Sequence, residues 1–250
     1  MGQHFLTDRN IAERITELLK AHGSDVIIEI GPGKGILTQF LKERKDKELI
    51  LIEIDNESVD YLEDVYPELK GSIISGDFLK EDISKLGRQI SIIGNFPYNI
   101  SSQIFFKVLE NVDIVNEVTG MLQKEVALRL ASGPGSKQYG ILSVLLQTWY
   151  DISIEFHVKP GSFYPPPEVN SSVIRLTRNQ RKELPCSRKK YKSIIKTAFN
   201  QRRKIMGNSL KSILVNLDGE IPYLSKRPEQ LSVEEFIELC LAIENTNLKK

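Results

Sequence analysis

The chain has 250 residues, 40% hydrophobic and 27% charged, enough for one large domain or a domain with a small appendage. Its formal net charge of +1 combines two opposite parts: residues 175–211 carry thirteen Lys and Arg against one acid, which is +12, and the other 213 residues carry −11. We find no apolar run of the ~20 residues that cross a membrane and no signal-peptide pattern, so we expect a cytoplasmic protein. The Cys and His residues have neither metal-binding nor disulfide-framework spacing, so we expect no metal site.

The first half of the chain alternates apolar runs with amphipathic segments. Strands are predicted over residues 25–30, 48–54, 72–75, 90–94 and 115–121. Helices are predicted over residues 8–23, 36–41, 57–66, 101–106 and 123–130, with Asp8 and Ser101 as caps of the first and fourth. Such an alternation indicates an α/β fold with a parallel sheet covered on both faces.

Beyond residue 130 the pattern changes. A Gly- and Pro-containing loop at 132–136 precedes a buried helix at 140–149. Two strands, at 151–158 and 169–176, have no helix between them and should pair antiparallel at the sheet edge. A polar stretch at 178–188 resembles a linker, and helices are predicted over residues 189–199, 205–214 and 233–244. We therefore expect a catalytic domain at 1–180 and a small helical domain at 181–250.

The glycine-rich loop at residues 31–35, Gly-Pro-Gly-Lys-Gly, joins the first strand to a helix. Its glycines allow backbone amides to approach a ligand, and the helix start adds partial positive charge. The loop matches neither the nucleoside-triphosphate motif nor G-x-G-x-x-G, because its third glycine comes one residue early. A short turn of this kind suits an amino-acid carboxylate and a nucleoside, although a helix-entry turn without a ligand is the common alternative.

Polar side chains stand at the ends of the following three strands. Glu53 lies 22 residues after Gly31, near the spacing expected for an acid that binds ribose hydroxyls. Asp77 can accept a hydrogen bond from an adenine amine, and Phe78 can supply a neighbouring backbone amide. With Asn95 at the end of the next strand, the four strand ends predict a nucleoside site for S-adenosylmethionine.

The turn at residues 95–98, Asn-Phe-Pro-Tyr, brings an amide, a fixed backbone and an aromatic ring together at a strand end. Asn95 offers an acceptor and donors, Pro97 restrains the chain, and Tyr98 offers a flat stacking face. These groups suit a planar ring with an exocyclic amine. Taken alone, the turn is better explained as an Asn-capped Pro turn without a ligand, because Asn and Pro are ordinary turn residues.

These motifs occur together in a known family. The chain resembles the KsgA-type rRNA adenine N6,N6-dimethyltransferases over almost its whole length and in the family's order. The matching segments are residues 3–6 (Gln-His-Phe-Leu), 29–35, 76–77, 95–101, 121–127, 134–137, 163–169 and 199–204. The resemblance implies a class I, Rossmann-like methyltransferase domain with a helical C-terminal domain.

The family pattern also assigns residues to the cofactor. By matching position, S-adenosylmethionine would be held by His4, Leu6, Gly31, Glu53, Asp77 and Asn95. His4 stands where the family often has Asn, and both can donate a hydrogen bond. Phe96 stands where Leu is common, which should preserve the turn because the useful group there is the backbone carbonyl.

The family activity suggests a mechanism for the turn. The Asn95 side-chain oxygen and the Phe96 carbonyl would accept hydrogen bonds from adenine N6, so that the amine attacks the sulfonium methyl in line. Pro97 fixes the turn, and Tyr98 would stack on the flipped base. Phe163 is a candidate for the other face of the base, and a core position is its alternative.

The partner implied by the resemblance is small-subunit rRNA, methylated at two adjacent adenosines near its 3′ end within a pre-assembled small ribosomal subunit. The basic segment suits such a partner, with Arg202, Arg203 and Lys204 as the main RNA-contact candidates. The substitution of Ile-Met-Gly at 205–207 for the family's usual Thr-Leu-Arg removes one basic residue. We expect a monomer without membrane contact. The alternatives are a large-subunit rRNA methyltransferase of the antibiotic-resistance type and a non-catalytic RNA-binding assembly factor.

Overall fold

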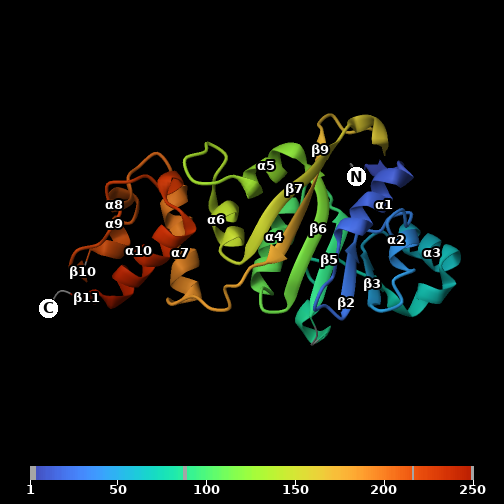
Figure 1. Cartoon of the computed structure of the whole chain (residues 1–250), viewed down its shortest axis with the longest axis horizontal. Helices are drawn as coiled ribbons and strands as arrows, with labels where there is room; N and C mark the ends of the chain where they lie inside the picture. The colour runs from blue at the N-terminus through green and yellow to red at the C-terminus, as the bar shows by residue number, and fades with distance from the viewer. Residues whose placement is uncertain (1–3, 87–88, 216, 249–250) are drawn as a thin grey trace. The chain divides into compact units, whose positions relative to one another are not determined.

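The computed structural model describes residues 4–86, 89–215 and 217–248 (Figure 1). Gln3, which opens the first family motif, lies outside the described residues. The chain forms two compact units, one of Met1–Ala127 with Asp151–Arg178 and the other of Leu128–Tyr150 with Asn179–Lys250. Residues 128–150, which the sequence-based division at residue 180 assigns to the first part, thus belong to the second unit.

A seven-stranded sheet forms the centre of the first unit, in the order β4-β3-β2-β5-β6-β9-β7. The five neighbouring strands β4, β3, β2, β5 and β6 run parallel to one another, and β9 is antiparallel to β6. This arrangement confirms the predicted α/β sheet. The strands are β2 (Val26–Ile30), β3 (Glu48–Glu53), β4 (Ile73–Ser75), β5 (Ile90–Asn95), β6 (Val115–Gln123), β7 (Tyr150–Val158) and β9 (Ser171–Arg178).

Burial along the strands follows their place in the sheet. All five residues of central β2 are buried, as expected where helices cover both faces of a parallel sheet. The edge strand β7 instead alternates exposed with half-buried residues between two buried ends. The carboxyl ends of the central strands are therefore held rigidly by the core.

Three helices connect parallel strands of the described residues: α2 (Thr38–Leu41), α3 (Asn56–Val65) and α4 (Ser101–Glu110). Helix α1 (Arg9–Leu18) precedes β2, α5 (Lys124–Ala131) follows β6, and short 3₁₀ turns lie at Pro67–Ser72 and Ile83–Leu86. Asp8 caps α1 by accepting hydrogen bonds from the backbone N–H groups of Asn10 and Ile11, as predicted. The predicted Ser101 cap is wrong, because Ile100 occupies the cap position of α4. The Ser101 hydroxyl instead donates to the carbonyls of Pro97 and Tyr98.

A small antiparallel ribbon, which the sequence did not predict, ties the N-terminus to the loop before β9. Strand β1 (Phe5–Leu6) pairs with β8 (Phe163–Tyr164), which follows a 3₁₀ turn at Pro160–Ser162. Leu6 faces Phe163 across the ribbon, and both side chains belong to the hydrophobic core. The family's first motif is therefore anchored beside its proline-rich loop.

The second unit is mainly helical. It contains α6 (Ile141–Gln147), α7 (Arg188–Asn200), α8 (Met206–Ser209), α9 (Lys211–Leu214), α10 (Val233–Asn245), a 3₁₀ turn at Pro228–Gln230, and a short ribbon of β10 (Leu217–Asp218) and β11 (Asn247–Leu248). The single helix expected at 205–214 is divided in two, with Leu210 between the parts. Thr148 and Tyr191 are buried, and their hydroxyls form a hydrogen bond of 2.9 Å. This bond links residues 128–150 to α7.

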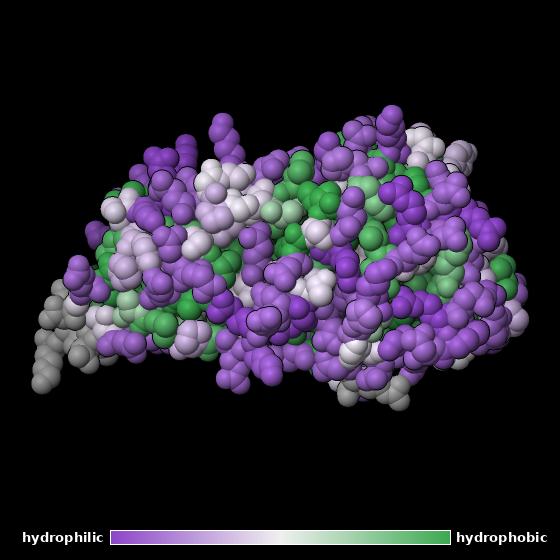
Figure 2. Space-filling view, in the orientation of Figure 1, coloured by the Kyte–Doolittle hydropathy of each residue, from purple (hydrophilic) through white to green (hydrophobic). Residues whose placement is uncertain are grey.

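The surface of the chain is largely polar on the face seen in Figure 2, with smaller hydrophobic patches between the hydrophilic side chains. The two cysteines, Cys186 and Cys240, are free and buried. None of the described helices is long and apolar enough to cross a membrane.

Candidate active site

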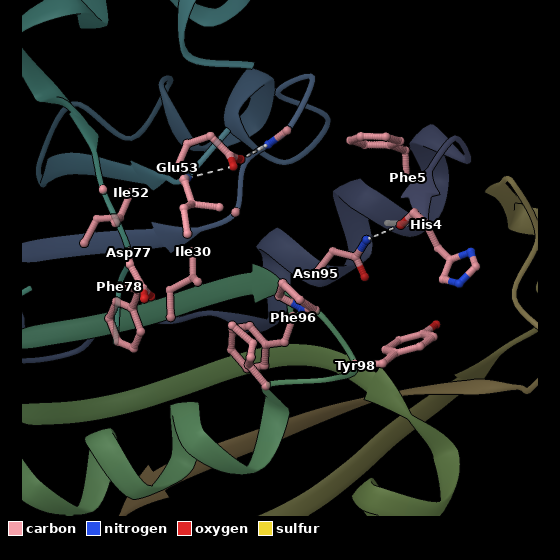
Figure 3. A pocket seen from close by; sticks show the side chains of 16 residues that line it. His4, Phe5, Ile30, Ile52, Glu53, Asp77, Phe78, Asn95, Phe96 and Tyr98 are labelled. Carbon is pink, nitrogen blue, oxygen red and sulfur yellow. Dashed lines mark hydrogen bonds between the residues drawn. The ribbon is translucent and has the colours of Figure 1, made fainter. Parts of the chain in front are cut away.

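A cavity opens where the chain changes direction across the sheet. From β2 the chain proceeds outward through β3 and β4, then returns to β5 on the other side of β2. Open α/β sheets bind ligands at such a switch point, beyond the carboxyl ends of the strands. The predicted residues that line this cavity are His4, Gly31, Glu53, Asp77, Phe78, Asn95, Phe96, Pro97 and Tyr98 (Figure 3).

The glycine loop bends tightly over one side of the cavity. Gly31 and Gly33 have φ values of +63° and +55°, which favour glycine. A Cβ at Gly33 would also meet the Phe5 ring at 2.9 Å. The loop therefore needs glycine there for its backbone conformation and for close packing against β1.

Glu53 closes the loop from the end of β3. One carboxylate oxygen accepts the Gly33 N–H at 3.0 Å, and the other accepts the N–H groups of Ile54 and Asp55 at 2.9 and 3.0 Å. The side chain is 2% exposed, so these backbone donors compensate the buried charge. The oxygen bound to Gly33 retains acceptor capacity for a ligand hydroxyl.

Asp77 and Phe78 follow β4 and line the end of the cavity that lies away from His4 (Figure 3). One Asp77 oxygen accepts the Leu79 N–H at 2.9 Å, which fixes the carboxylate. The Phe78 side chain is buried, and the Lys107 ammonium lies 5.4 Å from its ring centroid. This end of the cavity thus combines an acceptor with an apolar wall, which suits a nucleobase.

Asn95 has a defined amide orientation. Its nitrogen donates to the His4 backbone carbonyl at 2.9 Å (Figure 3). A carbonyl can only accept, so the assignment of nitrogen and oxygen follows from this contact. The Asn95 side-chain oxygen points away from His4, and no donor among the described residues is bonded to it.

The Phe96 carbonyl lies next in the chain and is the second acceptor of the turn. The Phe96 N–H donates to Met121 at 3.0 Å, and the next two carbonyls, of Pro97 and Tyr98, accept the Ser101 hydroxyl. Within the described part of the chain no group donates to the Phe96 carbonyl. Two acceptors from consecutive residues, neither of them bonded to a donor of the described residues, therefore follow one another at the end of β5.

The Phe96 ring is an anchor for this turn and is only 1% exposed. It packs edge-on against Phe105 and fills the space left by Gly94 and Gly120, where a Cβ would lie 3.0 and 2.1 Å from the ring. The larger Phe at this position is thus accommodated by two glycines of adjacent strands, and the backbone carbonyl keeps its place.

Tyr98 and His4 form the opposite end of the cavity. The Tyr98 hydroxyl lies 2.5 Å from the buried Ser171 hydroxyl, and burial raises the pKa of the phenol, so it is neutral at physiological pH. The His4 ring lies 5.6 Å from the Tyr98 ring at a tilt of 32°. His4 Nδ1 is 2.8 Å from the Pro165 carbonyl, and because a carbonyl can only accept, Nδ1 donates in this contact.

The model of the ribosomal RNA adenine dimethylase family matches residues 1–243. The chain belongs to this family. It is 56% identical to the ribosomal RNA small subunit methyltransferase A of Parabacteroides distasonis, over 100% of this chain and 94% of the relative. The corresponding protein of Porphyromonas gingivalis is 56% identical over 98% of this chain and 96% of its own length.

Solved structures agree on the fold. A dimethyladenosine transferase from Plasmodium falciparum superposes with a TM-score of 0.81 at 23% identity, covering 96% of this chain and 98% of the other. The 23S rRNA methyltransferase ErmE gives a TM-score of 0.68 at 24% identity, covering 94% and 99%. This family member therefore has the Rossmann-like methyltransferase fold that the sequence predicts.

Two predicted site residues lie outside the cavity. Phe163 is 4% exposed and packs in the core, where Leu6 also lies, so the structure places it at the alternative position considered for it. Leu6 borders a small hollow behind the glycine loop. The physical reason is the ribbon register, which turns Leu6 and Phe163 together toward the core.

The predicted RNA contacts lie on a turn after α7 in the second unit. Arg202 donates to the Ser136 carbonyl at 3.1 Å and lies 3.9 Å from Glu229, so its guanidinium is partly engaged. Arg203 and Lys204 are exposed. The turn thus meets the loop that contains another family motif, residues 134–137.

Sequence reasoning missed the apolar lining of the cavity. The residues are Phe5, Ile30, Ile52, Ile54 and Ile100. Ile30, Ile52 and Ile54 stand directly beside Gly31 and Glu53, so their position at strand ends was a usable signal. Ile54 is 60% exposed and lines the cavity, so a ligand bound there would cover part of its side chain.

Proposed function

We propose that this chain uses S-adenosylmethionine to dimethylate N6 of two adjacent adenosines in the 3′-terminal hairpin of small-subunit (16S) rRNA, during small-subunit biogenesis. The proposal is supported by family membership and by relatives of 56% identity that are named for small-subunit rRNA methylation. The observation that carries the chemistry is the pair of acceptors at Asn95 and Phe96, to which none of the described residues donates a hydrogen bond.

The cavity fits the cofactor. Glu53 has an acceptor site left for the ribose hydroxyls, and Asp77 can accept from the adenine amine. Ile52, Ile54 and Phe78 supply apolar contact for the adenine ring. When bound, S-adenosylmethionine supplies an electrophilic methyl group on its sulfonium.

The chain's own residues orient the nucleophile. Adenine N6 is a weak nucleophile because its lone pair is delocalised into the ring. In the first transfer, hydrogen bonds from its two N–H groups to the Asn95 oxygen and the Phe96 carbonyl would localise that lone pair and direct it at the methyl group. In the second transfer, the one N–H group that remains on N6 would donate to one of these acceptors. Tyr98, neutral at physiological pH, stacks on the base and takes no proton. The proton of N6 leaves after transfer, so no strong base is needed.

The second unit contributes affinity for RNA. Arg203 and Lys204 are exposed cations on the turn fixed by the Arg202–Ser136 contact, and phosphate contacts of this kind hold structured RNA. The substrate would be the rRNA within a pre-assembled small subunit, bound by a monomer in the cytoplasm. Sedimentation of the free protein measures whether it is a monomer, and sedimentation of the protein with small subunits measures whether it binds them.

The function is tested by incubating the protein with labelled S-adenosylmethionine and either unmethylated small subunits or large subunits. We expect label only in small-subunit rRNA, mapped to two adjacent adenosines. Label in large-subunit rRNA would identify the antibiotic-resistance type of activity instead. Binding to small subunits without label would indicate a non-catalytic assembly factor.

A further inference from the structure

An exposed tyrosine stands beside the cavity without a place in the chemistry described so far. In the β1–β8 ribbon Tyr164 pairs with Phe5, and Phe163 pairs with Leu6. Directly paired residues of an antiparallel ribbon project from the same face, with Cβ atoms about 5 Å apart. Leu6 and Phe163 take the core face, so Tyr164 shares the other face with Phe5, which lines the cavity.

Tyr164 is 74% exposed, the highest value among the exposed large hydrophobic side chains of the described residues. An aromatic ring left in water contributes little to folding, whereas Phe163 next to it is buried. The exposed neighbours Pro165 and Pro166 are uncharged, so this surface offers stacking and no charge attraction for phosphate. Its chemistry suits the flat face of a base.

The backbone that carries Tyr164 is fixed to the cavity wall. The Pro165 carbonyl accepts a hydrogen bond from His4 Nδ1 at 2.8 Å, and the Ser162 carbonyl accepts one from the Thr7 N–H at 2.8 Å. Phe5 and His4 stand at the end of the cavity away from Phe78 (Figure 3). The backbone on both sides of Tyr164 is thus held in place before RNA arrives, which lowers the entropic cost of binding.

We propose that Tyr164 stacks on the unpaired base next to the adenosine that occupies the cavity. The inference deepens the proposed function and rests on it, because two adjacent adenosines are modified. When one base is turned out of its stack into the cavity, its neighbour loses a stacking partner, and the exposed aromatic ring on the Phe5 face of the ribbon replaces it. After the first adenosine is modified, the same ring holds that adenosine while the next enters.

The test compares Tyr164→Ala with Tyr164→Phe in the full chain, with methyl transfer to unmethylated small subunits as the assay. Loss of one base stack should raise KM for subunits about tenfold in Tyr164→Ala, with kcat and KM for S-adenosylmethionine within about twofold of wild type. Tyr164→Phe should behave as wild type, because the ring remains. Tyr61→Ala, which removes another exposed tyrosine, on α3, is the matched control and should leave every constant unchanged.

A second measurement observes the base directly. An RNA hairpin in which one of the two adenosines is replaced by 2-aminopurine should show base fluorescence that wild type quenches and Tyr164→Ala does not. An unchanged KM in Tyr164→Ala, or an equal rise in KM for S-adenosylmethionine, would overturn the inference, since the latter means that the loop, with His4, has moved. Failure of wild type to methylate small-subunit rRNA at all would instead overturn the proposed function.

Discussion

The strand ends of the first unit and the basic turn of the second hold their functional groups in opposite ways. Asn95 and Glu53 are fixed by hydrogen bonds to backbone groups, and their remaining acceptors face the cavity. Arg203 and Lys204 are exposed on a turn whose Arg202 side chain donates to the Ser136 carbonyl. Chemistry on one nitrogen needs fixed geometry, whereas contact with a charged backbone tolerates mobile side chains. Substitutions in the two regions should therefore change different kinetic constants.

The largest effect is expected from Asn95→Ala. Loss of the acceptor that orients N6 should lower kcat about 100- to 1,000-fold, while binding to small subunits persists. Single-turnover methylation and a subunit-binding assay measure the two effects separately. Asn116→Ala is the matched control, because Asn116 also donates its amide to a backbone carbonyl, that of Gly23 at 3.0 Å, and lies outside the cavity. Near-normal turnover in Asn95→Ala would remove Asn95 from the mechanism.

The double substitution Arg203→Ala with Lys204→Ala should produce the reverse pattern. Loss of two phosphate contacts should raise KM for subunits about tenfold or more, with kcat unchanged, and should reduce the slope of the logarithm of the binding constant against the logarithm of salt concentration by about 2. The control pair Lys182→Ala with Lys189→Ala removes the same charge from exposed positions of the same unit. Equal effects of the two pairs would mean that overall charge, and no local contact, governs binding.

A moderate effect is expected where the cavity depends on a single hydroxyl pair. Tyr98→Phe and Ser171→Ala each break the 2.5 Å contact that holds the Tyr98 ring, and each should lower kcat/KM by about fivefold, equivalent to a hydrogen bond of about 1 kcal/mol. The double variant should be no worse than either single one. Tyr191→Phe breaks a comparable pair in the second unit and should reduce thermal stability without altering the methylation constants of the folded enzyme. Additive losses at Tyr98 and Ser171 would contradict the coupling.

The smallest effect on turnover, and a clear one on stability, is expected at Glu29 behind the glycine loop. Burial raises the pKa of this carboxyl from 4.5 to about 8, with Glu53 adding to the rise. The folded chain thus binds a proton more tightly than the unfolded chain, so Tm should fall as pH rises from about 4.5 to about 8. Glu29→Gln cannot ionise and can still accept from Thr38, so its Tm should vary less with pH. Parallel curves for the two proteins would refute the raised pKa.

The strand ends were predictable because their signals are local. Strand periodicity and the order of Gly31, Glu53, Asp77 and Asn95 are enough to bring these residues to one edge of a parallel sheet, and the cavity contains all four. The orientation of the Asn95 amide was not predictable, because it depends on the His4 carbonyl, 91 residues away in the chain.

Other failures arise from pairings that no local pattern encodes. The β1–β8 ribbon forms between residues about 160 apart, and its register decides that Phe163 is buried and Tyr164 exposed. Residues 128–150 join the second unit because they pack with α7, through contacts such as that of Thr148 with Tyr191. A one-residue change of register in the ribbon would exchange the faces of the two aromatic rings, so the sequence alone could not decide which ring is buried.

The two acceptors at the end of β5 should direct methyl transfer to adenine N6 in small-subunit rRNA. Mass spectrometry of nucleosides from small subunits methylated by the purified protein tests this role directly, because it identifies the modified nucleoside itself. We expect N6,N6-dimethyladenosine at two adjacent positions of the 3′-terminal hairpin with wild type, and none with Asn95→Ala. Methylation at another atom of adenine, or dimethyladenosine confined to large-subunit rRNA, would show that these acceptors do not have the proposed role.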